Sequence, residues 1–169
     1  MLKGKCYGIL QDDSMIYGDN CFEDVKDCIK SALNFGATSF MLGDSGDFNS
    51  KVLKILTKLN KNRKNPFDII IISTDNTHPK LLEQFKNYNL LILHNNNLNS
   101  NIAKNFIINQ FIINNSYKNI AFENIKLFES LSVKEFIVIN PLNNKEICIA
   151  PKPVDPNEYI NMSGITLLE

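Results

Sequence analysis

The chain has 169 residues, and its 18 basic and 18 acidic residues give a formal net charge of zero. That length suits one domain, and an apolar fraction of 44% excludes a chain that is disordered throughout. A net charge of zero provides no electrostatic attraction to nucleic acid or to an anionic membrane. No apolar run approaches the roughly 18 residues of a membrane span. We therefore expect neither nucleic acid nor a membrane among the partners.

The cysteines carry no signature of a metal or disulfide framework. Cys6, Cys21, Cys28 and Cys148 show no C-x-x-C spacing, and no histidine cluster accompanies them. Free thiols are typical of a reducing compartment. The first ten residues lead into a strand-like run without a signal-peptide pattern. We expect a cytoplasmic protein with no metal site built from its own Cys and His residues.

Short apolar runs alternate with segments of helical periodicity along most of the chain. In chain order we expect a strand at Lys5–Leu10, a helix from the N-cap Asn20 to a stop at Gly36, a strand at Thr38–Leu42, a helix over Val52–Leu59, a strand at Asp68–Ser73, a helix opened by Thr77 and Pro79, a strand at Leu90–Leu93, helices at Ser100–Asn114 and Asn119–Leu131, and strands at Glu135–Ile139 and Glu146–Ala150.

This order predicts an α/β fold with a doubly wound sheet. The four consecutive isoleucines of Asp68–Ser73 indicate a strand buried on both faces, which is typical of parallel sheets. Strands alternating with helices favour right-handed crossovers. We expect a Rossmann-like, mostly parallel sheet of five to six strands with helices on both faces and an antiparallel last strand. Residues 1–150 form this single domain, and residues 151–169, with three prolines, form an extension packing on the domain or a neighbour.

The most informative loop is the turn Gly43–Asp47, between a predicted strand and a predicted helix. In doubly wound sheets, ligands bind outside the carboxyl ends of the strands. Two glycines three residues apart let the backbone approach a phosphate, and the following helix adds its positive N-terminus. The local alternative is a plain tight turn with Asp47 as the N-cap. Because Asp44 and Asp47 repel a phosphate, a sugar hydroxyl or Mg²⁺ is expected between them and the ligand.

The predicted ligand site is formed by the segments that follow the first three strands. Its residues are Gln11, Asp12, Gly43, Asp44, Ser45, Gly46, Asp47, Asn49, Thr74 and Asp75. In this hypothesis Ser45 donates to a phosphate, and Asn49 hydrogen-bonds a sugar or base. Asp44 or Asp47 accepts a ribose hydroxyl.

One stretch of the chain resembles a known family. Residues 36–49 read Gly-Ala-Thr-Ser-Phe-Met-Leu-Gly-Asp-Ser-Gly-Asp-Phe-Asn and precede the helix Val52–Leu59. This pattern resembles the SLOG superfamily, especially its YpsA-like branch, and Asn105–Ser116 is similar to a later helix of that family. The resemblance implies a Rossmann-like fold that binds nucleotides or their derivatives. Some relatives cleave N-glycosidic bonds with an acidic residue in a second glycine-rich motif.

The chain departs from the family pattern at positions that matter for catalysis. Asp44 stands where the family has a second glycine, and Asn49 replaces a carboxylate. Tyr117–Ala121 occupies the region of the second glycine motif. We therefore expect a nucleotide-binding protein without efficient catalysis, and we assign no catalytic residue.

Two other functions remain open. One is a protein-interaction module of receiver or flavodoxin shape without a small-molecule site, with the helix Ser100–Asn114 and the tail at a homodimer or partner interface. Asp12-Asp13 and the strand ending at Ser73 resemble receiver features, although a receiver has its phosphoacceptor aspartate at the position of Ser73.

The other is a residual nucleotide N-glycosidase or phosphoribohydrolase. This activity needs a carboxylate at the glycosidic bond, and the residues that could supply it are Asp12, Asp44, Asp47 and Glu123.

Overall fold

A computed structural model describes residues 4–11, 17–75, 77–94, 101–122 and 135–151. Its elements in chain order are β1 (Lys5–Ile9), α1 (Asp19–Asn34), β2 (Ala37–Gly43), α2 (Asp47–Lys61), β3 (Asp68–Thr74), α3 (Pro79–Glu83), β4 (Asn89–Leu93), α4 (Asn101–Asn115), β5 (Lys118–Ile120), β6 (Phe136–Asn140) and β7 (Lys145–Ile149).

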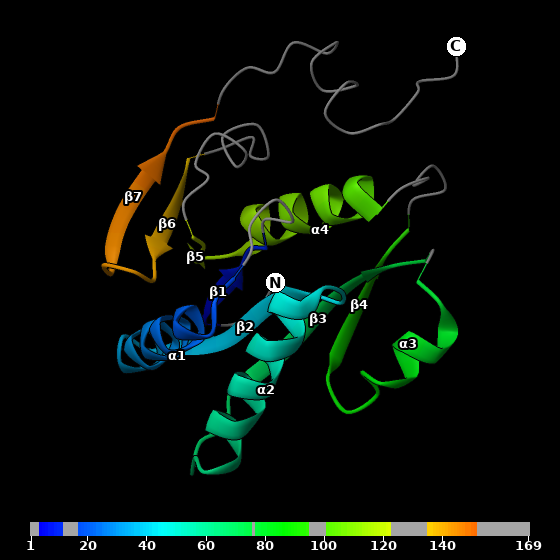
Figure 1. Cartoon of the computed structure of the whole chain (residues 1–169), viewed down its shortest axis with the longest axis horizontal. Helices are drawn as coiled ribbons and strands as arrows, with labels where there is room; N and C mark the ends of the chain where they lie inside the picture. The colour runs from blue at the N-terminus through cyan, green and yellow to red at the C-terminus, as the bar shows by residue number, and fades with distance from the viewer. Residues whose placement is uncertain (1–3, 12–16, 76, 95–100, 123–134, 152–169) are drawn as a thin grey trace.

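The strands form one sheet in the order β4-β3-β2-β1-β5-β6-β7 (Figure 1). Neighbouring strands are parallel except for β7, which pairs antiparallel with β6. This confirms the predicted α/β, doubly wound fold and the antiparallel last strand. In the flavodoxin and receiver order, the first strand lies between the second and the third. Here β1 lies between β2 and β5, so the receiver-like alternative is wrong in topology.

The sheet carries helices on both faces (Figure 1). On one face α1, α2 and α3 pack against a cluster that includes Tyr7, Phe40 and Ile71. On the other face α4 packs against a second cluster that includes Met41 and Ile72. Because alternate residues of a strand point to opposite faces, both faces of β2 and β3 are apolar. The run of isoleucines in β3 follows from this double burial.

The sheet has seven strands, whereas five to six were expected. The extra strand is β5, which lies where the sequence predicts the start of a helix at Asn119–Leu131; residues 123–134 lie outside the described part of the chain. Asn119 and Ile120 are buried between β1 and β6. The spacing of Ala121 with later apolar residues suggested a helix, because a strand of three residues is too short to show its own periodicity.

Glycines take the N-cap positions at which side chains were expected. Helix α1 begins at Asp19 with Gly18 as N-cap, not at Asn20, and no side chain caps it. Helix α2 begins at Asp47 with Gly46 as N-cap, so Asp47 is the first helical residue. The predicted stop at Gly36 is confirmed by its φ of 89° and by its amide, which donates to the carbonyl of Leu33.

The four cysteines are free thiols. Cys6 and Cys28 are buried, and burial raises the pKa of the Cys28 thiol to about 12. These two thiols therefore stay protonated and serve as small apolar core groups. Among the helices of the described ranges, none has the length and apolar character needed to cross a bilayer. The predicted C-terminal extension falls almost wholly on residues 152–169, outside the described part.

Candidate functional site

The strand order places a switch point at the carboxyl end of β1. From β1 the chain passes through β2 and β3 to the edge strand β4, and α4 then returns it over the opposite face to β5, on the other side of β1. Crevices at such reversals are the usual ligand sites of doubly wound sheets. The loops after β1, β2 and β3 therefore form the crevice at which a ligand is expected.

The turn after β2 opens into a cavity of about 410 Å³ between the first turns of α2 and the α3 region. Six of the ten predicted site residues line it, together with a wall from α2 and from the α3 segment. The lining residues are Gly43, Asp44, Ser45, Gly46, Asp47, Asn49, Ser50, Leu53, Leu81, Gln84, Phe85 and Tyr88. The lining is thus polar at the turn after β2 and largely apolar along the α3 segment.

The space beside both glycines of the turn is used by amide side chains of the protein itself. A Cβ atom at Gly43 would lie 2.9 Å from Nδ2 of Asn49. At Gly46, where φ is 91°, a Cβ atom would lie 2.4 Å from the Gln11 amide nitrogen. The close approach that the sequence analysis assigned to a phosphate is therefore taken, on the Cβ side, by Asn49 and Gln11.

Asp44 is the centre of a buried network. Its carboxylate is fully buried, and Oδ2 accepts from Ser73 Oγ at 2.5 Å and from Thr77 Oγ1 at 2.8 Å. The Lys104 ammonium, on α4, lies 2.9 Å from the same oxygen and also donates to Thr77 Oγ1 at 2.9 Å. The role expected for Asp44, accepting a ribose hydroxyl, is filled at Oδ2 by three protein donors. The Lys104 ammonium also neutralises the negative charge of Asp44, which was expected to repel a phosphate.

Helix α4 closes the crevice with further polar contacts. The Asn109 amide donates to the Gln11 carbonyl at 2.9 Å, and Ser45 Oγ lies 3.4 Å from Asn105 Oδ1. Asn49 Nδ2 donates to the Ser45 carbonyl at 2.9 Å. The contribution of α4 was not predicted, although Asn105 and Asn109, four residues apart and so on one side of the helix, were a readable signal.

Buried oxygens without a hydrogen-bond partner among the described residues include three on the segment after β2 and at the end of β3. They are Asp44 Oδ1, Asn49 Oδ1 and Thr74 Oγ1. Buried polar atoms without partners are uncommon, and each calls for an explanation such as a bound group. Two of the three are pure acceptors, and because all three atoms are buried, they do not face the open space of the cavity.

Of the other predicted residues, Gln11, Thr74 and Asp75 are not part of the cavity lining. Asp12 is outside the described part of the chain. Thr74 is fully buried, and the Asp75 carboxylate lies 3.5 Å from Nδ1 of His94. Within the described residues, no three His, Cys, Asp or Glu side chains come together as metal ligands.

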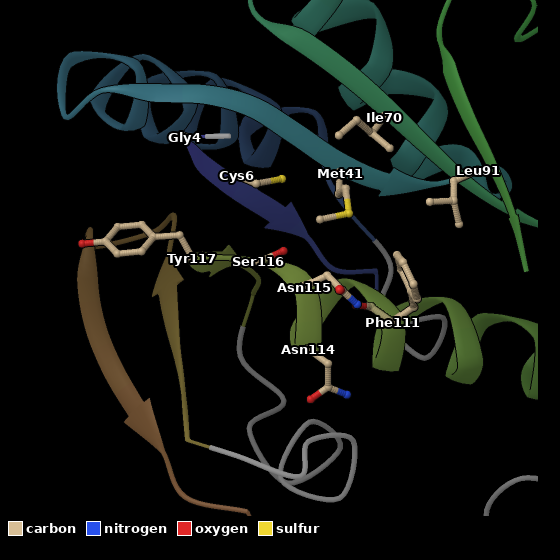
Figure 2. Close-up of a pocket in the computed structure, with 10 residues that line it drawn as sticks. All are labelled: Gly4, Cys6, Met41, Ile70, Leu91, Phe111, Asn114, Asn115, Ser116 and Tyr117. Atoms are coloured by element: carbon tan, nitrogen blue, oxygen red, sulfur yellow. The ribbon is translucent and has the colours of Figure 1, made fainter. Parts of the chain in front are cut away.

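A larger cavity, of about 690 Å³, lies on the α4 face of the sheet. Figure 2 shows Cys6, Met41, Ile70, Leu91 and Phe111 around it. Its rim includes polar residues from the end of α4, but the side chains of Asn114, Asn115 and Ser116 hydrogen-bond carbonyls of that helix. Among the described residues that line this cavity, none is charged. It therefore offers little to orient a polar ligand, in contrast to the cavity at α2.

The fold and the crevice define a Rossmann-like α/β protein with a polar cavity at the start of its second helix. No protein-family model matches the chain, and no curated protein matches it significantly. The geometry of the site and the motif at residues 36–49 are therefore the features that bear on function.

Proposed function

We propose that the protein binds a nucleotide or nucleotide derivative in the cavity at the start of α2, without efficient catalysis. The observation that carries the proposal is the lining of this cavity, in which the turn Gly43–Asp47 faces apolar side chains across a space of about 410 Å³. That volume lies within the range of small-molecule sites. The resemblance of residues 36–49 to the SLOG pattern points to the same ligand class.

The polar end of the cavity suits the phosphate and ribose. The first amides of α2 have no partner within the helix, and they present donors and a positive dipole at the turn. The Lys104 ammonium offsets the charge of Asp44. The remaining exposed carboxylate, Asp47, is a ligand for Mg²⁺ carried on the phosphates.

The apolar end of the cavity suits a base. Leu53, Leu81, Phe85 and Tyr88 contribute to its wall, and aromatic faces stack on any base without reading its identity. Among the candidate carboxylates of the residual-glycosidase hypothesis, Asp44 is not available for catalysis. The residual-glycosidase hypothesis needs a free carboxylate at the glycosidic bond, and three donors hold this one at Oδ2.

A thermal-shift screen of the full chain tests the proposal. The panel holds nucleotides, cyclic nucleotides, ADP-ribose, NAD and sugar phosphates, each with and without Mg²⁺. A ligand at about 100 times its Kd adds roughly 2.7 kcal/mol of stability. That gain raises Tm by several degrees. Release of free base is followed in parallel, and we expect none at a rate useful to a cell.

The matched variants are Ser50→Trp and Lys54→Trp. Both positions are exposed on α2, but only Ser50 lines the cavity. We expect Ser50→Trp to abolish the ligand-induced shift by filling the cavity, and Lys54→Trp to keep it. A panel without any shift would contradict the proposal and favour the protein-interaction module.

A further inference from the structure

Strand β4 is an open edge of the sheet with an apolar sequence. Its residues read Asn-Leu-Leu-Ile-Leu, without a charge or a proline. Among the described residues, no strand pairs with its outer side. The backbone N–H and C=O groups on that side are therefore a template for another strand.

Both faces of this edge expose apolar side chains. Leu91 is 38% exposed and Ile92 is 36% exposed. Consecutive residues of a strand point to opposite faces, so the two side chains lie on different sides of the sheet. If β4 lacked only a covering helix, side chains on one face of the strand would be exposed. If it lacks a neighbouring strand, side chains on both faces are exposed. The exposure thus points to a strand as the group that covers β4.

The other edge of the sheet is protected in a way that β4 is not. Strand β7 carries Lys145 and Glu146 in its exposed part. Charged residues are the common device by which natural proteins keep edge strands from pairing. Since β4 lacks this device, its edge is available for pairing.

We propose that β4 pairs antiparallel with β4 of a second copy of this chain, about a two-fold axis at Leu91. In a homodimer with this symmetry, a residue that precedes Leu91 lies opposite the partner residue that follows Leu91 by the same number of positions. Leu91 lies opposite Leu91 of the partner subunit, and Leu90 opposite Ile92 of the partner subunit. Because β4 has no charged residue, the self-pairing creates no like-charge contact, and it buries the side chains that are exposed in the single chain.

The surface next to the edge extends the same interface. Leu91 also stands in the wall of the larger cavity, beside Ile70 and Met41 (Figure 2). A strand laid along β4 places its own apolar side chains beside this wall. The proposal is independent of the nucleotide site, because none of the residues of β4 lines the cavity at α2.

The test is the mass of the full chain by sedimentation, from low to high micromolar concentration. We expect 19.2 kDa at the dilute end and twice that value at the concentrated end. Leu91→Lys puts two positive charges opposite each other, and we expect it to remain monomeric throughout. Leu142→Lys adds the same charge at an exposed position of the β6–β7 turn and should dimerise like the unmodified chain.

Two outcomes would overturn the proposal. One is a monomer at every concentration. The other is a dimer that survives Leu91→Lys; if Ile107→Lys then removes it, the interface lies on α4, as the sequence analysis considered. Circular dichroism checks that each variant is folded.

A cross-link reports the register separately. Opposed residues of an antiparallel pair have Cα atoms about 4.5–5.5 Å apart. This separation falls within the rough 4.4–6.8 Å range of disulfides. In a Cys148→Ser background, which removes the exposed thiol, Leu91→Cys should yield a covalent dimer on mild oxidation. A dimer that does not cross-link through this residue would disprove the two-fold axis at Leu91.

Discussion

At the scale of single residues, the Lys104–Asp44 pair holds the crevice together. Asp44 follows β2, and Ser73 lies in β3. Lys104 comes from α4, which covers the face of the sheet opposite to α1, α2 and α3. The Lys104 side chain reaches over the carboxyl edge of the sheet to a carboxylate that is fully buried. Removing one partner of such a pair leaves an uncompensated charge in the interior.

We expect Lys104→Met to destabilise the protein by roughly 3–5 kcal/mol, the usual cost of breaking a buried ion pair. The measurement is urea unfolding at neutral pH. Lys26→Met is the matched control, because the Lys26–Glu23 pair lies on the surface of α1. The control should unfold like the unmodified chain, since surface pairs contribute little. Equal stability of both variants would show that the Asp44 network does not hold α4 in place.

The residues of the turn Gly43–Asn49 could be identified from the sequence, but their partners could not. Two glycines between a strand and a helix are a local signal, and local signals survive in the sequence. The partners of Asp44 lie 29, 33 and 60 positions further along the chain. No spacing rule connects residues so far apart, because their proximity depends on the strand order.

At the scale of the elements, the N-cap glycines of α1 and α2 differ in whether their backbone conformation requires glycine. Gly46 has φ 91° and ψ 153°, a region that glycine alone adopts readily, and the Gln11 amide fills the space beside it. Gly18 has φ −72°, which any residue adopts, and nothing lies within 4 Å of its Cβ position. The turn into α2 therefore depends on its glycine, and the turn into α1 does not.

We expect Gly46→Ala to cost about 1–3 kcal/mol because of the backbone strain, beyond any clash with Gln11. Gly18→Ala, the same substitution at the same helix position, should cost less than about 1 kcal/mol. Thermal unfolding of the two variants side by side measures the difference. If both variants lost the same stability, the left-handed backbone at Gly46 would not be required for the fold.

Helix α4 shows how an element can be predicted correctly while its surroundings are not. Its range differs from the expected Ser100–Asn114 by one residue at each end. Within this helix Ala103 and Phe106 are buried, whereas Ile107 and Phe111 are only partly covered. The buried positions also include Ile108 and Ile112, because polar and apolar residues are spread around α4 and its sequence does not mark one face.

At the scale of the whole molecule, the sheet has a protected centre and two different edges. Strands β1, β2 and β3 are paired on both sides, whereas β4 and β7 are the ends of the sheet. The cavity at α2 and the β4 edge are adjacent in the chain, since Tyr88 lines the cavity and Asn89 begins β4.

Hydrogen exchange read by mass spectrometry can follow this arrangement. We expect the amides of β1 and β2 to exchange most slowly and those of β4 and β7 to exchange fastest in dilute protein. At high concentration the protection of β4 should rise, because a second copy covers its edge, while that of β7 stays unchanged. A sample that dimerises without added protection of β4 would contradict the proposed interface.

The sequence by itself determined the class of fold and the position of the crevice turn. Both depend on periodicity and on turn residues, which are properties of neighbouring positions in the chain. Only the tertiary structure decided the strand order, the short central strand β5, the pairing of Lys104 with Asp44 and the open edge at β4. These features depend on the direction of each crossover connection in the sheet. That direction is determined by how apolar surfaces distant in the sequence pack together.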